Sequence, residues 1–208
     1  MKNIFLQHNF DLSHEELEQF QKFLSLFMEY NSHTNLSAIR DEAGIIEKHF
    51  VDSLYGAAAV ELHGRILDIG SGGGFPGIPL KIIAPDLRIT LLDSVGKKVK
   101  AMNHFVENLG LTGITAIQER AEVLAKNPEH KAQYDFVVSR ATAYMTEILT
   151  WAEPFLAKSG KIILYKMPSE DEKKDILKVT KRLNLVLEGE MEYELAGKER
   201  IIYVFSRK

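Results

Sequence analysis

The stretch from Arg65 to Pro79 constrains the fold of this chain more than any other segment. It reads R-I-L-D-I-G-S-G-G-G-F-P-G-I-P, and five of the eight residues 70–77 are glycine. Glycine tolerates positive φ angles and lets a backbone approach a ligand closely, and Pro76 suits the first turn of a helix. The segment therefore predicts a buried strand, a tight glycine-rich turn and a helix, a unit that cradles nucleotide-like ligands.

The class of ligand depends on what accompanies the glycines. A phosphate-binding P-loop needs Lys followed by Ser or Thr, and neither pair follows here. The dinucleotide pattern G-x-G-x-x-G fails at its third glycine, where Phe75 stands. Asp68, Gly70, Gly72 and Gly74 instead give D-x-G-x-G-x-G, the pattern of S-adenosylmethionine (SAM) binding in Rossmann-like methyltransferases. SAM has no pyrophosphate, and its ammonium and sulfonium groups suit an acidic residue at the strand end. A glycine-rich turn without a ligand is the alternative that these residues leave open.

Composition narrows the protein class. The 208 residues are 45% hydrophobic and 26% charged, and the net charge is −3, as expected for one soluble globular domain without an overall basic charge. No segment approaches the roughly 20 apolar residues of a membrane span. The chain has no cysteine, which excludes disulfides, thiolate metal sites and a Cys nucleophile. We expect a cytoplasmic protein without a bound metal.

Strand and helix patterns alternate from position 65 onward, which predicts a mostly parallel, doubly wound sheet. The last two strand-like runs flank Ala196-Gly197-Lys198 and predict an antiparallel hairpin, which Rossmann-like methyltransferases have and dinucleotide dehydrogenases do not need. The expected fold is a seven-stranded, mostly parallel sheet. Its strands are predicted at 65–70, 88–93, 114–118, 134–139, 161–166, 185–194 and 200–206, with helices at 77–84, 95–109, 145–157 and 169–182.

Residues 1–60 are predicted to form a helical extension that packs on a methyltransferase core of residues 61–208, as one compact unit. Ser13 and Glu16 form a capping-box pattern before an apolar stripe at helical spacing. A polar, turn-like segment follows at 30–37, and a second helix is predicted from 41 to 59.

Three polar residues are candidates for catalysis. His49 and Asp52 are three positions apart in the second helix and share one face, so they can lie together beside the glycine loop. A purely structural hydrogen bond explains these two residues equally well. Arg140 follows the fourth strand, where a guanidinium can bind the carboxylate of a cofactor or a substrate phosphate. A structural ion pair is the alternative for Arg140.

Other candidate cofactor residues follow from strand ends, because ligands of such sheets bind outside the carboxyl ends of the strands. Asp93 ends the second strand, and its carboxylate can accept both ribose hydroxyls. Ala121 and Glu122 follow the third strand and are expected near the adenine, as is the Ser139-Arg140-Ala141 segment.

Two features missing from the sequence narrow the range of atoms that this protein is expected to methylate. Amino-group methyltransferases acting on adenine or cytosine typically carry (Asp/Asn)-Pro-Pro-(Tyr/Phe) after strand four, where this chain has Ser-Arg-Ala-Thr at 139–142. Methylation of cytosine carbon 5 needs a Cys nucleophile. What remains is attack by an atom that needs little activation, such as a ring nitrogen, or methylation of a small molecule.

Taken together, these motifs resemble the bacterial 16S ribosomal RNA guanine-N7 methyltransferase family, called GidB or RsmG. The similarity covers nearly the whole chain. It includes Asn35-Leu36 with Arg40, H-x-x-D-S at 49–53, D-I-G-S-G-G-G-F-P-G-I-P-L at 68–80, L-L-D-S-x-x-K-K at 91–98, S-R-A at 139–141 and a C-terminal strand with Arg200.

The resemblance implies a SAM-dependent enzyme that methylates N7 of a guanosine in 16S rRNA, free or within the 30S particle, and releases S-adenosylhomocysteine. We expect a monomer. It implies cofactor contacts from Gly70, Phe75, Ala121, Glu122 and Arg140, and from Asp93. It also places Arg40, His49, Lys97 and Arg200 near RNA or substrate. A base turned out of its loop would stack on Phe75 or Tyr144. A small-molecule methyltransferase and a non-catalytic SAM- and RNA-binding protein share these motifs and stay open, whereas Phe75 and Asp68 disfavour an NAD-dependent oxidoreductase.

Overall fold

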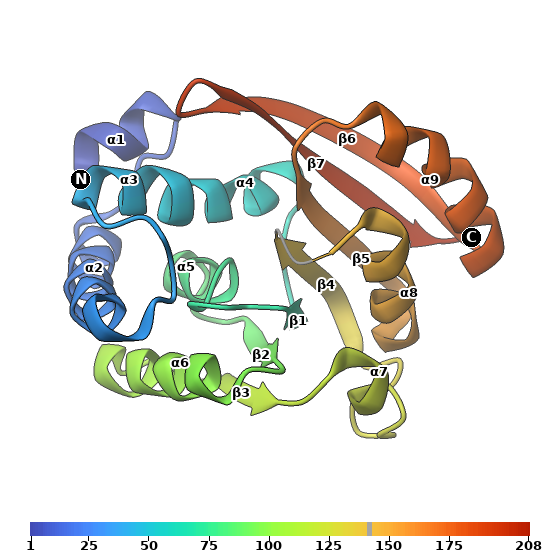
Figure 1. Cartoon of the computed structure of the whole chain (residues 1–208), viewed down its shortest axis with the longest axis horizontal. Coiled ribbons are helices and arrows are strands. Elements are labelled where there is room, and N and C mark those ends of the chain that lie inside the picture. The colour runs from blue at the N-terminus through green and yellow to red at the C-terminus, as the bar shows by residue number, and fades with distance from the viewer. Residues whose placement is uncertain (141–142) are drawn as a thin grey trace.

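The computed structural model describes residues 1–140 and 143–208 and shows an α/β fold (Figure 1). Among these residues, seven strands form one sheet in the order β3-β2-β1-β4-β5-β7-β6. The first five strands pair in parallel, and β7 is antiparallel to both β5 and β6. The predicted seven-stranded, mostly parallel sheet with a C-terminal hairpin is confirmed. The strands are β1 (Arg65–Ile69), β2 (Arg88–Asp93), β3 (Ile114–Gln118), β4 (Tyr134–Arg140), β5 (Leu156–Lys166), β6 (Leu185–Leu195) and β7 (Lys198–Arg207).

Helices cover both faces of the sheet (Figure 1). In Figure 1, α2, α5 and α6 lie to the left of the sheet and α8 and α9 to its right. The helices are α1 (Lys2–Gln7), α2 (His14–Thr34), α3 (Glu42–Ile45), α4 (Asp52–Ala59), α5 (Gly77–Ile83), α6 (Gly96–Leu109), α7 (Ala121–Leu124), α8 (Met145–Ala152) and α9 (Glu170–Leu183), with a π-helix η1 (Ile46–Val51) and a 3₁₀-helix η2 (Glu153–Phe155). No helix in the described ranges is both long and apolar enough to cross a bilayer.

The strand order places β1 inside the sheet, between β2 and β4. β1 leads directly into the glycine loop, defined here as residues 70–76, and α5 begins at Gly77 after it. Connections leave β1 and β4 in opposite directions along the sheet, and this reversal opens a crevice at their carboxyl ends.

The N-terminal helices contribute to the same hydrophobic core as one face of the sheet. Phe23 and Phe27 of α2 and Phe50 of η1 are fully buried and belong to one cluster with α6 and β2 residues. The ring of Phe75, in the glycine loop, lies 5.2 Å from that of Phe27 and 5.5 Å from that of Phe23, measured between centroids. The shape of the loop therefore depends on α2. The division at residue 60 stays a prediction.

Several local expectations differ from the structure. The capping box at Ser13 and Glu16 is present, but α2 continues to Thr34 through residues expected to be turn-like, because the left-handed cap comes only at Asn35, with φ 55°. The predicted helix at 41–59 is continuous but contains the π-helical turn η1. The predicted helix at 145–157 ends earlier, since β5 begins at Leu156. α1 was not predicted.

Candidate functional site

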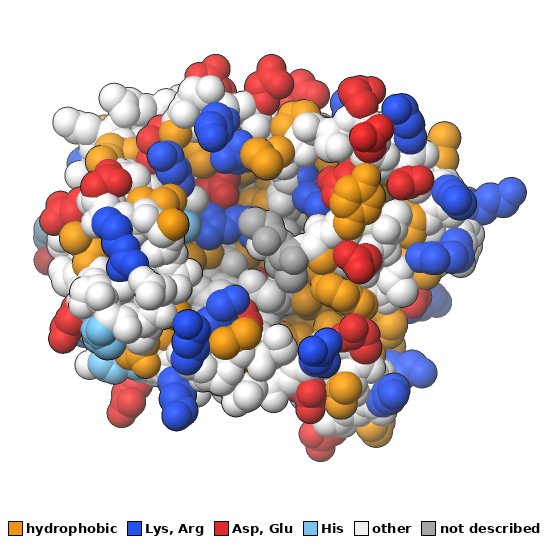
Figure 2. Space-filling view, viewed as in Figure 1, with side chains coloured by type: hydrophobic (Ala, Val, Ile, Leu, Met, Phe, Trp, Pro, Cys, Tyr) orange, Lys and Arg blue, Asp and Glu red, His pale blue; other side chains and the backbone are white. Residues whose placement is uncertain are grey.

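Two connected clefts open at the carboxyl ends of the strands, and Figure 2 shows the hollowed centre of this face. The major cleft, of about 770 Å³, is lined by the glycine loop, η1, Arg140, Tyr144, the end of β5 with residues 167–169, and the C-terminal hairpin. The minor cleft, of about 270 Å³, lies over the ends of β2 and β3. Gly70 and Lys98 line both clefts. An elongated ligand can therefore extend from one into the other past the glycine loop.

The glycine loop is held by hydrogen bonds to the end of β2. Gly70 and Ser71 both donate their N–H to the Leu92 carbonyl, at 2.7 and 3.1 Å. Gly72 donates to Asp93 Oδ2 at 3.0 Å. Gly72 has φ 59°, and in the direction of an added Cβ the nearest atom is the Gly70 carbonyl oxygen at 3.9 Å. The loop backbone thus faces open space at this point, where a ligand can approach closely.

Asp68 supports the loop from below. Its side chain is fully buried, and Oδ2 accepts the Gly77 N–H at 2.9 Å. Burial raises the pKa of Asp68 to about 7. Oδ1 has no hydrogen-bond partner among the described residues. Asp68 therefore fixes the start of α5, and the predicted direct contact between its carboxylate and a cofactor stays a prediction.

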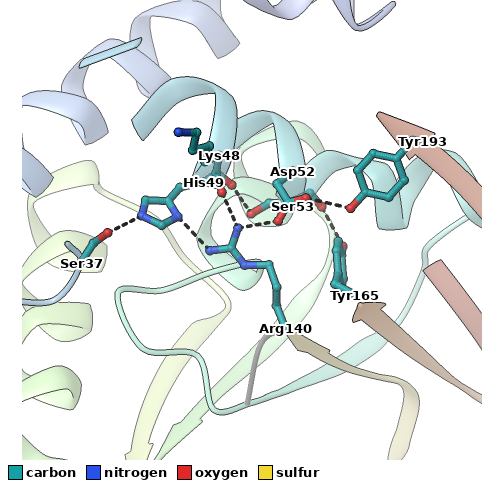
Figure 3. Close-up of polar contacts among 8 residues, drawn as sticks. All are labelled: Ser37, Lys48, His49, Asp52, Ser53, Arg140, Tyr165 and Tyr193. Carbon is teal, nitrogen blue, oxygen red and sulfur yellow. Dashed lines mark hydrogen bonds and ion pairs between the residues drawn. The ribbon is translucent and has the colours of Figure 1, made fainter. Parts of the chain in front are cut away.

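Arg140 connects β4 to the π-helix η1 (Figure 3). Its Nη1 donates to Asp52 Oδ2 and to the Lys48 carbonyl, both at 2.9 Å, and its Nη2 lies 3.1 Å from His49 Nδ1. The guanidinium carbon also lies 5.2 Å from the centre of the Phe75 ring. The candidate residues Arg140, His49 and Asp52 therefore form one network. A π-turn is a common device at functional sites, and here it carries the carbonyl and the imidazole that Arg140 contacts.

His49 is neutral in this network. Arg140 Nη2 has only protons to offer, so His49 Nδ1 accepts from it and the imidazole proton is on Nε2. Nε2 lies 2.8 Å from Ser37 Oγ, to which it donates. Burial and the Arg140 charge lower the pKa of His49 to about 3. The imidazole also stacks on Phe75, with ring centroids 4.7 Å apart.

Asp52 is held on both carboxylate oxygens. Oδ2 accepts from Arg140, and Oδ1 accepts from the hydroxyl of Tyr193 at 2.7 Å. Tyr193 is in β6 and stacks on Tyr55 of α4, with ring centroids 3.8 Å apart. Burial and the Asp52 charge raise the pKa of Tyr193 above its usual range. The C-terminal hairpin thus contributes directly to the site.

Comparison with known proteins decides the family. The model of the GidB family, described as rRNA small subunit methyltransferase G, matches residues 16–199. The chain belongs to this family. The ribosomal RNA small subunit methyltransferase G of Desulforamulus reducens is 39% identical over 174 residues, which are 83% of this chain and 72% of the relative. That of Lactococcus lactis subsp. cremoris is 37% identical over 203 residues, 95% of this chain and 85% of the relative.

Solved structures confirm the fold class that the motifs predicted. The ribosomal protein L11 methylase of Lactobacillus delbrueckii subsp. bulgaricus has a TM-score of 0.60 at 16% identity and covers 77% of this chain and 79% of its own. The precorrin-6y C5,15-methyltransferase of Geobacter metallireducens has a TM-score of 0.58 at 16% identity, covering 76% of this chain and 88% of its own. The fold is therefore the Rossmann-like methyltransferase fold.

A methyltransferase of this family and fold uses SAM, and the two clefts fit its chemistry. The minor cleft offers the carboxylates of Asp93 and Glu122 beside Ala121, acceptors that suit ribose hydroxyls and an adenine amino group. Gly70, Gly72 and Phe75 line the major cleft with Arg140, next to the open space above Gly72. The predicted cofactor residues, Asp68 apart, thus line the two clefts, which share Gly70 and Lys98. Ala141 lies outside the described residues.

Of the four residues expected near RNA, two line the major cleft and two do not. His49 and Arg200 line the major cleft. Arg40 is exposed and donates to the Asn31 carbonyl and to Asn35 Oδ1, which connects it to the end of α2. Lys97 is exposed at the start of α6, with Nζ 3.4 Å from the Thr34 carbonyl. Arg40 and Lys97 are therefore on the surface around the cleft rather than in its wall.

Sequence reasoning missed several residues of the site. Tyr193 and Tyr165 line the major cleft, and the Tyr165 hydroxyl donates to the Ser53 carbonyl at 2.7 Å. Lys98 pairs with Asp93 at 3.4 Å between the two clefts. Ser37 holds the His49 tautomer. The K-K pair at 97–98 was a usable signal for Lys98, whereas no local pattern marks either tyrosine.

Proposed function

We propose that this protein transfers a methyl group from SAM to N7 of a guanosine in 16S ribosomal RNA. Membership of the rRNA small subunit methyltransferase G family supports the substrate class. One observation supports a ring nitrogen as the methylated atom. His49 and Asp52, the candidate bases, are both occupied by hydrogen bonds to their neighbours. A site of this kind suits an acceptor atom that needs no deprotonation.

The chain's own residues would hold the cofactor in two parts. Asp93, Ala121 and Glu122 would receive the adenosine in the minor cleft, and Gly70, Gly72 and Phe75 would lie along the rest of the molecule. Arg140 is 12% exposed at its side chain and is positioned to meet a carboxylate or a phosphate in the major cleft. When bound, SAM supplies a methyl group activated by its positive sulfonium.

Guanine N7 carries a lone pair and no proton, so no general base is required. The protein would act mainly by orienting the purine, a contribution of up to roughly 7–11 kcal/mol in well-aligned reactions. Asp52 would contribute a negative charge near the cation that develops on the purine. His49, with a pKa lowered to about 3, would act as a neutral acceptor that fixes Arg140.

Basic side chains around the cleft support RNA as the substrate. Arg200 and Lys98 line the major cleft, and Lys97 and Arg40 are exposed near it. Such residues neutralise phosphates and give salt-dependent affinity. We place the protein in the cytoplasm, as a monomer, where 16S rRNA or the 30S particle would meet the cleft.

Methyl transfer from radiolabelled SAM tests this function. The substrates are naked 16S rRNA and 30S particles from cells that lack the gene, and the product is mapped by N7-specific strand cleavage. The proposal predicts one modified guanosine and shows which substrate form is used. Methylation of a small metabolite without RNA would contradict it, and so would tight SAM binding without turnover on either substrate.

A further inference from the structure

The two walls of the major cleft differ in charge. Lys48, Lys98 and Arg200 line the cleft from η1, α6 and β7. The opposing wall consists of Tyr144, residues 166–169 and Glu172. Lys166 is paired with Glu172, and Glu170 and Asp171 lie behind this wall in the first turn of α9. Figure 2 shows blue side chains to the left of and below the central hollow, with orange and red ones at its right edge. An RNA backbone is attracted to the first wall and repelled by the acidic turn behind the second.

The second wall presents two large apolar side chains to solvent. Tyr144 is 44% exposed and Met167 is 64% exposed, and both line the major cleft. Exposed apolar side chains grouped at a cavity are typical of binding surfaces. We call these two residues the apolar rim.

A buried ion pair fixes the backbone of the apolar rim. Lys166 Nζ donates to Glu172 Oε1 at 2.7 Å and to the Ala143 carbonyl at 2.8 Å. The same Glu172 oxygen accepts the Met145 N–H at 3.0 Å. Residues on both sides of Tyr144, and the residue before Met167, are therefore tied to one ion pair. The rim is held in place before any ligand arrives, which reduces the entropy cost of binding.

The aromatic ring deeper in the cleft is already engaged. Phe75 is 5% exposed and stacks with His49, and the Arg140 guanidinium also lies against it. Of the two rings suggested for base stacking, Phe75 and Tyr144, only Tyr144 offers a large exposed surface. A base that enters the cleft from a backbone on the basic wall meets the apolar rim on the other side.

We propose that Tyr144 and Met167 receive the face of the target purine, while the phosphates flanking it lie along Lys48, Lys98 and Arg200. This inference rests on the proposed function and names the contacts that hold the base. Bases stack on aromatic side chains in single-stranded recognition, and a target base inside a folded RNA is turned out of its stack. Stacking on the rim would set the orientation of N7 in the cleft.

The test compares Tyr144→Ala, Tyr144→Phe, Met167→Ala and Lys48→Ala with the wild type. The substrate is the form of 16S rRNA that the wild type methylates. Leu177→Ala is the matched control, because Leu177 is 81% exposed on α9 and does not line the cleft. Three quantities are measured: kcat/KM for methylation, SAM affinity by calorimetry, and RNA affinity as a function of KCl concentration.

Tyr144→Ala is expected to lower kcat/KM by about 5-fold or more, since stacking contributes about 1–3 kcal/mol per base. Tyr144→Phe and the control should stay within about 2-fold, and Met167→Ala should show a smaller loss, because Tyr144 carries the aromatic face. SAM affinity and the slope of log K against log[salt] should not change for Tyr144→Ala, whereas Lys48→Ala should reduce the slope by about 1.

Three results would overturn the inference. Full kcat/KM in both Tyr144→Ala and Met167→Ala would show that the rim does not hold the base. A reduced salt slope in Tyr144→Ala would place the RNA backbone there, and a loss of SAM affinity would place the cofactor there. A wild type that methylates no RNA would instead reject the proposed function, so the two failures are distinguishable.

Discussion

Replacing Arg140 with Met should destabilise the fold strongly. The Arg140 guanidinium is the partner of Asp52 Oδ2, the Lys48 carbonyl and His49 Nδ1. The Arg140 and Asp52 side chains are only 12% and 9% exposed. Met fills a similar volume but leaves the Asp52 carboxylate buried, with the Tyr193 hydroxyl as its one remaining donor among the described residues. Removing one partner of a buried ion pair costs about 3–5 kcal/mol, and we expect a loss in this range.

A double-mutant cycle isolates the pair. Asp52→Asn in the Arg140→Met background replaces the unpaired carboxylate with a neutral amide, so part of the loss should be recovered. The free energy of unfolding lost in the double variant should be smaller than the sum of the two single losses by about 0.5–3 kcal/mol, the coupling found between residues in direct contact. The free energy of unfolding is measured by urea titration at pH 7, followed by Trp151 fluorescence and far-ultraviolet circular dichroism.

The control is a surface ion pair. Lys161 and Glu188 are paired at 2.7 Å, but both side chains are 37% exposed. Lys161→Met should therefore cost only about 0–1 kcal/mol. The reasoning is refuted if Arg140→Met costs no more than this control, or if the Arg140 and Asp52 losses simply add.

Three further results are expected. The imidazole of His49 should stay neutral in NMR titration down to about pH 4, because its pKa is lowered to about 3. Since the unfolded chain binds this proton near pH 6.5, the stability that neutral His49 contributes is lost as the pH falls from about 6.5 toward 3. His49→Gln should therefore lose less stability over this range. An imidazole that titrates above pH 6 in the folded protein would contradict the argument. Gly73→Ala should lower the free energy of unfolding by about 1–3 kcal/mol in urea and weaken SAM binding in calorimetry, because a Cβ there would lie 2.7 Å from the Phe27 ring. Gly189→Ala is the control, because a Cβ at that position meets nothing within 4 Å. Equal stability of the two variants would refute the argument. Deletion of residues 1–60 should abolish cooperative unfolding of residues 61–208, because the two parts share one core; a truncated chain that unfolds cooperatively and binds SAM would show two separable units.

The strands in the central part of the fold were predictable because glycine and other turn residues separate each strand from the next element. Strands at 88–93 and 114–118 were predicted at their observed bounds, since short apolar runs there are separated by clear turn residues. The end of α2 and the start of β5 were not predicted. Tyr30–Thr34 is polar and looks turn-like, but burial of Asn31 and the left-handed cap at Asn35 extend the helix.

The site was predictable where its residues follow strand ends and not where it depends on long-range contacts. Asp93 and Arg140 end parallel strands and Ala121 comes shortly after one, so their positions around one crevice come from topology alone. The hydrogen bond from Tyr193 to Asp52 joins residues 141 apart, and no local pattern reveals such a partner. The burial of Asp68 was also hidden, because the motif shows that an acid is present but not which way its carboxylate points.

Identification of the methylated atom tests the central claim most directly. Purified protein is incubated with SAM carrying a deuterated methyl group and with 16S rRNA or 30S particles from cells that lack the gene. The rRNA is then digested to nucleosides and analysed by mass spectrometry. The account predicts about one labelled 7-methylguanosine per 16S rRNA and no other labelled nucleoside, because N7 accepts a methyl group without a base. Label on an exocyclic amino group or on ribose, both of which must lose a proton, would contradict it.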